Sequence, residues 1–160
     1  MTQEPAVEQL IARGKEALAR NQYLAALDDL QAAAARRPEF ADVQNLTGVC
    51  LSMLGRPEEA LAAFTRATEL NPGYVEAHLN RAITLNDLGR LDEARASFVR
   101  AAEADEEKGG GGRFSSAAAA RLANLHGELA ETYEQAGAPE EAVEQYRRAV
   151  ELRPRFLDIR

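Results

Sequence analysis

Apolar side chains recur every three or four residues along most of the chain, and short polar breaks interrupt this pattern. Such spacing places apolar residues on one side of a helix. Few segments show the alternation that strands need. The pattern predicts an all-α fold with helices at about 5–20, 23–36, 40–54, 57–70, 74–88, 91–104 and 139–152, and a longer one from Ser115 or Ser116 to Ala136. In the second helix, the inward side chains are expected to be Leu24, Leu27, Leu30 and Ala34.

A short motif separates the two helices of a pair. It reads Gly55-Arg56-Pro57-Glu58-Glu59-Ala60, and similar forms recur at 89–94 and 137–142. The glycine can take the left-handed conformation that ends a helix. Proline or leucine then begins the next helix, and two acidic residues face the positive end of its dipole. In the first pair Asn21-Gln22 takes the place of this motif.

The helix pairs repeat with a period of 34 residues, which separates Gly55 from Gly89, Pro38 from Pro72, and Ala60 from both Ala26 and Ala94. The next alanine, Ala142, follows Ala94 by 48 residues, which is 14 more than the period. A loop with four consecutive glycines, 109–112, and the longer helix account for the difference. We therefore predict a single domain, 1–160, with repeats at about 5–38, 39–72, 73–106 and 115–154, a Gly-rich insertion at 105–114, and the start of a truncated fifth repeat at 155–160.

The aligned copies resemble the tetratricopeptide repeat. The eighth position of the repeat is small, as Gly14, Gly48, Ala82 and Ala130. The twentieth is alanine in all four copies, as Ala26, Ala60, Ala94 and Ala142. The twenty-fourth is large, as Leu30, Phe64, Phe98 and Tyr146. The fourth position, often tryptophan in the family, departs from the pattern as Leu10, Gln44, His78 and His126. The resemblance implies a right-handed α-α superhelix of four repeats, whose first helices line a concave groove where ligands usually bind.

The groove implied by this resemblance draws on five positions of each first helix. They supply Asp42, Asn45, Leu46, Val49 and Ser52; Glu76, Leu79, Asn80, Ile83 and Asn86; and Asn124, Glu128 and Glu131. An asparagine side chain can grip a peptide backbone because it both donates and accepts hydrogen bonds. The family members that clamp a carboxylate need lysines and an arginine on neighbouring repeats, and the matching positions here carry none. Arg113 and Phe114, beside the glycines, are candidate loop contacts.

The remaining composition excludes several classes of function. A net charge of −7 leaves no basic surplus for non-specific nucleic-acid binding. No apolar stretch is long enough to cross a membrane, and the only cysteine, Cys50, lies in an apolar stretch and cannot form an internal disulfide. His78 and His126 are expected to pack rather than bind metal. The segment 108–113 lacks the ending of a phosphate-binding loop.

The sequence therefore predicts a cytoplasmic, non-catalytic scaffold without cofactor or metal, which binds a peptide or protein in its groove. One alternative is a self-assembling module that forms homo-oligomers, because residues 155–160 suggest that no capping helix covers the C-terminal end. The other is the regulatory part of a larger complex. No membrane or nucleic-acid partner is expected.

Overall fold

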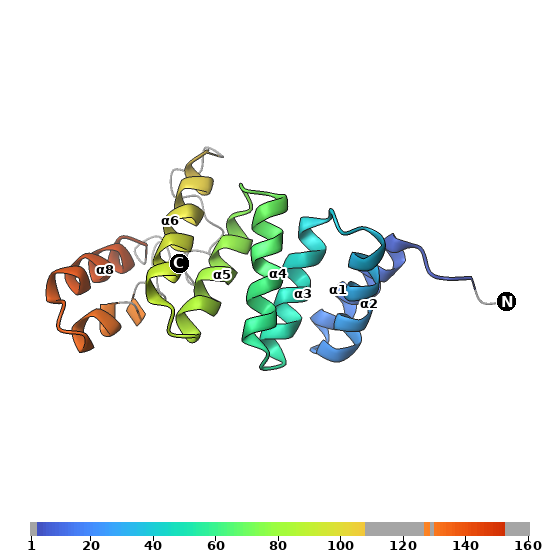
Figure 1. Cartoon of the computed structure of the whole chain (residues 1–160), viewed down its shortest axis with the longest axis horizontal. Helices are drawn as coiled ribbons and strands as arrows, with labels where there is room; N and C mark the ends of the chain where they lie inside the picture. Colours follow the sequence, from blue (N-terminus) through green and yellow to red (C-terminus); the bar gives the residue numbers. More distant parts are fainter. Residues whose placement is uncertain (1–2, 108–126, 129, 153–160) are drawn as a thin grey trace, which may run out of the picture. The chain divides into compact units, whose positions relative to one another are not determined.

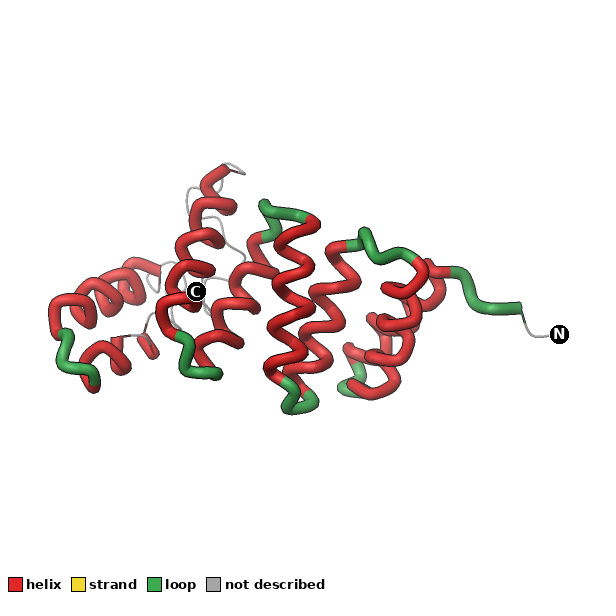
Figure 2. The backbone as a smooth tube through the Cα atoms, viewed as in Figure 1, coloured by secondary structure: helices red, strands yellow, loops and turns green. Residues whose placement is uncertain are grey.

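The computed structural model describes residues 3–107, 127, 128 and 130–152, and within this part of the chain every regular element is a helix (Figures 1 and 2). The Gly-rich insertion and the predicted fifth-repeat segment lie outside the described residues, as do Arg113, Phe114, Asn124 and His126. The chain forms two compact units, Met1–Ala104 and Asp105–Arg160. Each unit is described separately.

The first unit holds three helix pairs, except that the last three residues of the final helix belong to the second unit. The pairs are α1 (Val7–Ala19) with α2 (Tyr23–Arg36), α3 (Ala41–Met53) with α4 (Pro57–Leu70), and α5 (Val75–Asp87) with α6 (Leu91–Glu107). The predicted helices are confirmed, and most of their ends agree within one residue. Helix α1 begins at Val7, two residues after the expected Pro5. The N–H of Ala6, just before the helix, donates to the side chain of Gln9 at 3.0 Å. Helix α6 continues three residues beyond the expected Ala104.

The three described turns that contain glycine end their first helices with the same backbone geometry. Gly55, Gly89 and Gly137 have φ near +75°, at 73°, 75° and 75°. The N–H of Arg56 donates to the carbonyl of Leu51 at 2.9 Å, and that of Gly55 donates to Ser52 at 3.1 Å. These are the two bonds of the glycine-terminated helix end. In the first pair Asn21 takes the left-handed conformation instead, with φ 60°.

Small residues let the helices of the first unit approach closely. Ala26, Ala60 and Ala94 are completely buried. A Cβ atom built on Gly48 would lie 2.5 Å from Cε1 of Phe64, and one on Gly14 would lie 2.8 Å from Cγ of Leu30. In the first two pairs, the large residue of the second helix therefore fills the space that the glycine of the first helix leaves open. This explains the pairing of small eighth and large twenty-fourth positions seen in the sequence.

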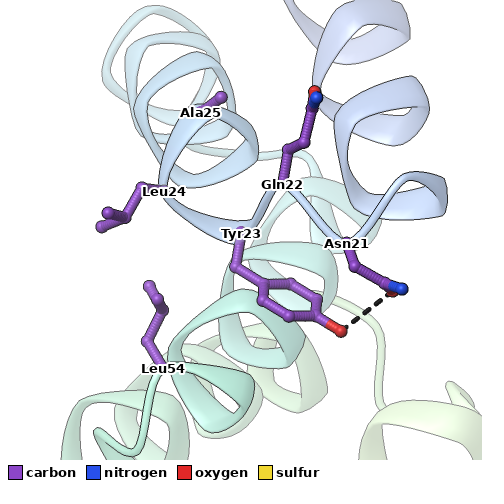
Figure 3. Close-up of a pocket in the computed structure, with 6 residues that line it drawn as sticks. All are labelled: Asn21, Gln22, Tyr23, Leu24, Ala25 and Leu54. Carbon is purple, nitrogen blue, oxygen red and sulfur yellow. Dashed lines mark hydrogen bonds between the residues drawn. The ribbon is translucent and has the colours of Figure 1, made fainter.

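The expectation that Leu24 faces inward is wrong. Its side chain is 67% exposed, whereas the buried residues of α2 are Ala26, Leu27, Leu30 and Ala33. Leu24 lies in the first turn of α2, ahead of this buried stripe, where it faces Leu54 across a surface hollow (Figure 3). Cys50 is completely buried, as expected.

The second unit contains one described first-helix segment and α8 (Pro139–Leu152). Residues 127, 128 and 130–135 are helical, Gly137 forms the turn, and Pro139 begins α8 with Glu140 and Glu141 in its first turn. Ala130 and Ala142 are buried. The helix predicted to end at Ala136 therefore has its C-terminal part confirmed, and the turn motif recurs in the second unit.

Candidate partner-binding face

The first helices of the first unit, α1, α3 and α5, form one face. Helix α1 contacts α3, and α3 contacts α5, in addition to their packing on the second helices (Figure 1). An ion pair joins Lys15 Nζ of α1 to Asp42 Oδ2 of α3 over 3.2 Å. Polar side chains then continue from α3 to α5. We call this surface of α1, α3 and α5 the first-helix face.

A buried hydrogen-bond network connects α3 to α5 on this face. Asn80 Nδ2 donates to Asn45 Oδ1 at 3.0 Å, and Asn45 Nδ2 donates to the hydroxyl of Tyr74 at 3.4 Å. The Tyr74 hydroxyl donates to Asp42 Oδ1 at 3.2 Å. Asn45 and Asn80 are only 1% and 6% exposed. Both amides therefore make bonds between repeats, which fixes α3 and α5 in register.

The phenol of Tyr74 is a hydrogen-bond donor in this network. Burial raises the pKa of Tyr74 well above its ordinary value, and the neighbouring carboxylate of Asp42 raises it further. The hydroxyl therefore keeps its proton at neutral pH. Sequence reasoning missed Tyr74 because it precedes α5 and lies outside the positions that line a first helix. Its place after Asn71-Pro72-Gly73 gives no sign of its role.

The other predicted groove residues differ in exposure. Asp42, Ser52 and Glu76 are exposed, Leu46, Val49, Ile83 and Asn86 are half-buried, and Leu79 is buried. In the second unit Glu128 and Glu131 are exposed on the helical segment before the turn. Among the predicted groove residues, those available to a partner are thus carboxylates, a hydroxyl, an amide and aliphatic side chains.

Beneath this face, Arg81 connects three helices. Its Nε donates to Thr65 Oγ1 of α4 at 3.0 Å, and its Nη1 donates to Ser97 Oγ of α6. Ser97 is buried and Arg81 is half-buried. The only arginine of α5 is therefore directed toward the second helices, and it adds no exposed cation to the first-helix face.

His78 is a packing residue, as predicted. It is 7% exposed, and its Nε2 lies 2.8 Å from the carbonyl oxygen of Pro72, which also accepts from Arg100 Nη2 at 3.2 Å. Burial lowers the pKa of His78, and the nearby guanidinium groups of Arg100 and Arg81 lower it further, although the bond to Pro72 opposes this shift. In the described part of the chain, no three His, Cys, Asp or Glu side chains are arranged to hold a metal ion.

Two equivalent surface hollows lie at the turn edge of the first unit. The first, of about 340 Å³, is lined by Asn21, Gln22, Tyr23, Leu24, Ala25 and Leu54 (Figure 3). The second, of about 300 Å³, is lined by Arg56, Pro57, Glu58, Glu59 and Leu88. The linings of the two hollows differ because Leu24 and Ala25 occupy the positions where the second repeat has Glu58 and Glu59. The first hollow is therefore more apolar.

Comparison with known families settles the class of the protein. A tetratricopeptide repeat profile matches residues 11–73 and 53–109, and a second profile of the same description matches 123–156. The chain belongs to the tetratricopeptide-repeat (TPR) family. TPR proteins are generally non-catalytic, and the similarity assigns this chain to the class of protein–protein interaction scaffolds. No described helix is both long and apolar enough to span a bilayer.

Solved structures of similar fold include other TPR proteins. A crystal structure of MamA aligns with a TM-score of 0.79 at 20% identity, over 95% of this chain and 81% of that chain. YrrB, a TPR protein with an unusual peptide-binding site, aligns with a TM-score of 0.74 at 26% identity, over 93% and 70%. The TPR domain of Sgt2 from Aspergillus fumigatus aligns with a TM-score of 0.69 at 24% identity, over 82% and 83%.

Proposed function

We propose that the protein binds a peptide, or an extended segment of a partner protein, on its first-helix face. The observation that carries this proposal is the side-by-side arrangement of aliphatic and acidic groups. Leu46, Val49 and Ile83 are half-buried, and the exposed carboxylates of Asp42 and Glu76 share the same helices. Groups of this kind provide both apolar contact and orientation for a ligand. The peptide-binding site of YrrB supports the proposal by analogy.

The proposal includes Ser52, Ile83 and Asn86 on this face of the first unit, and the binding roles of Glu128 and Glu131 in the second unit stay predictions. Direct contact through Asn45, Leu79 or Asn80 would require these buried side chains to leave their present surroundings. The parts assigned to Asn124, Arg113 and Phe114 stay predictions, as do a cytoplasmic location and membership of a larger complex. Assembly through the C-terminal end also stays a prediction, since residues 153–160 lie outside the described part of the chain.

Selection of ligands from a displayed random-peptide library, with the whole chain as bait, tests the proposal. Dissociation constants of the selected peptides are then measured for Val49→Asn and for the matched control Val99→Asn. Val49 is on the first-helix face, whereas Val99 is 43% exposed on the second helix α6. We expect Val49→Asn to weaken binding at least about fivefold, because it removes apolar contact area.

The control Val99→Asn should change the dissociation constant less than about twofold. Circular dichroism confirms that both variants remain helical. Equal effects of the two substitutions, or a library that yields no binding peptide, would contradict the assignment of the first-helix face.

A further inference from the structure

We infer that the preferred partner segment is an extended peptide in which basic and aliphatic residues alternate, recognised through its side chains. The inference rests on the proposed function and specifies the class of ligand for the same face. Three features carry it: a row of carboxylates, a parallel row of aliphatic groups, and the commitment of the asparagine amides to the protein itself.

The carboxylate row consists of Glu8, Asp42 and Glu76. Each is the second residue of its first helix, and consecutive members are 34 residues apart. All three are exposed. Asp42 pairs with Lys15, whereas Glu8 and Glu76 have no ion-pair partner among the described residues. The row therefore presents negative charge at the same end of α1, α3 and α5.

Helix dipoles alone favour acidic residues at helix starts, and α4 and α6 begin with them too. In α4 and α6, however, one of the two acids in the first turn has a cation beside it. Arg56 pairs with Glu59 and Arg90 pairs with Glu93, each at 2.5 Å. On the first-helix face, α3 contains no lysine or arginine and the arginine of α5 points toward α4 and α6. Glu8 and Glu76 are thus left for an external cation, whereas Asp42 already pairs with Lys15 of α1.

The aliphatic row lies two turns further along the helices. Val49 and Ile83 are equivalent residues, seven positions after Asp42 and Glu76, and both are half-buried. Leu46 lies one turn after Asp42. Successive side chains of an extended peptide point to opposite sides. A peptide that crosses the first helices between the two rows can therefore direct basic side chains toward the carboxylates and aliphatic ones toward Val49 and Ile83.

The asparagine amides favour recognition through side chains rather than through the peptide backbone. Asn45 donates to Tyr74 and accepts from Asn80, and both asparagines are almost completely buried. Breaking these bonds to bind a ligand would cost the protein buried hydrogen bonds between the second and third repeats. The second unit has the same sign of charge on its first helix, because residues 127–135 include Glu128, Glu131 and Glu134 but no lysine or arginine.

Three synthetic peptides of equal length test the inference. All carry valine and leucine at alternate positions, and the other positions carry lysine, glutamine or glutamate. Fluorescence anisotropy measures their affinity for the full chain at about 50 mM and about 300 mM NaCl. We expect the lysine peptide to bind at least about tenfold more tightly than the glutamine peptide at low salt, and this preference to shrink at high salt because screening weakens exposed ion pairs.

Matched variants locate the effect. Glu76→Gln on α5 should weaken the lysine peptide about two- to fivefold. Glu58→Gln is the control, because Glu58 is the second residue of the second helix α4 and the charge change is identical. It should leave affinity unchanged.

The outcomes separate this inference from the proposed function. If the lysine and glutamine peptides bind equally and Val49→Asn weakens both, the face binds peptides but the charge preference is wrong. If the lysine peptide binds and Glu58→Gln weakens it as much as Glu76→Gln does, the charge is not read on the first-helix face, and the inference is overturned. If no peptide binds, or Val49→Asn affects none, the proposed function fails with it.

Discussion

The charged side chains of α4 and α6 are paired differently from those of α3 and α5. On α4 and α6 several acidic residues have a basic partner on the same helix or its cap, and the pairs recur one repeat apart: Arg56–Glu59 with Arg90–Glu93, and Arg66–Glu69 with Arg100–Glu103. The guanidinium of Arg90 holds the pKa of Glu93 below its usual value. On α3 and α5 the described carboxylates instead reach toward neighbouring helices or toward solvent. Helices α4 and α6 thus neutralise part of their own surface, whereas Glu76 of α5 stays open to a partner.

The largest expected effect comes from breaking the packing that holds both kinds of helix together. Phe64 of α4 is 2% exposed and lies against Gly48 of α3. Phe64→Ala should lower the free energy of unfolding by about 3–5 kcal/mol, because it removes a buried ring and leaves a cavity. Leu24→Ala, which truncates a leucine that is 67% exposed, should cost less than about 0.5 kcal/mol. Urea denaturation measures both, and comparable losses would contradict the described core.

A smaller effect is expected from the network that connects the first helices. Asn45→Ala should destabilise the protein by about 1–3 kcal/mol, since it leaves the buried amide of Asn80 without its Asn45 partner. Ser52→Ala, an exposed position on the same helix, should cost less than about 0.5 kcal/mol. Thermal denaturation followed by circular dichroism compares them. A neutral Asn45→Ala would show that the network does not hold the first helices in register.

The paired charges of the second helices should contribute less still. A double-mutant cycle with Arg66→Ala and Glu69→Gln isolates the coupling between two residues three positions apart on α4. We expect a coupling free energy of about 0.2–0.5 kcal/mol at low salt, which high salt reduces. Chemical denaturation at two salt concentrations measures it. A coupling that salt leaves unchanged would mean that the second-helix pairs act by something other than exposed electrostatics.

The last prediction concerns pH, and its effect is confined to the acidic range. The folded protein lowers the pKa of His78 below its ordinary value near 6.5, so the unfolded chain binds the proton more readily. Stability should therefore fall as the pH drops from about 6.5 toward the folded pKa, and it should gain nothing further from His78 above that range. The comparison of His78→Gln with the unaltered protein across this range measures the contribution. An identical pH dependence in both proteins would rule out His78 as its source.

Local rules explain why the helices could be predicted from the sequence. Gly55, Gly89 and Gly137 end helices in the left-handed conformation, and proline or acidic residues follow at the next helix start. These signals act over a few residues, so they do not depend on the rest of the fold. The period of 34 then places the helix pairs, because small and large residues must meet at fixed positions, as Gly48 and Phe64 do.

The details of the first-helix face could not be predicted in the same way. The Asn45–Asn80 bond joins residues 35 apart at unequal repeat positions, and its geometry depends on how α3 and α5 pack. Tyr74 completes the network from outside a helix. Leu24 has the spacing of an inward residue, yet the buried stripe of α2 begins only at Ala26. Each case depends on neighbouring repeats, which the pattern within one repeat does not contain.

The most direct test of the account is a backbone amide NMR titration of the whole chain with the lysine-containing peptide. We expect the chemical-shift changes to concentrate on α3 and α5, around Val49, Glu76 and Ile83, and the signals of α4 and of the exposed side of α6 to change little. Changes centred on the second helices, or on the hollow beside Leu24, would contradict the claim that the first-helix face is the binding surface.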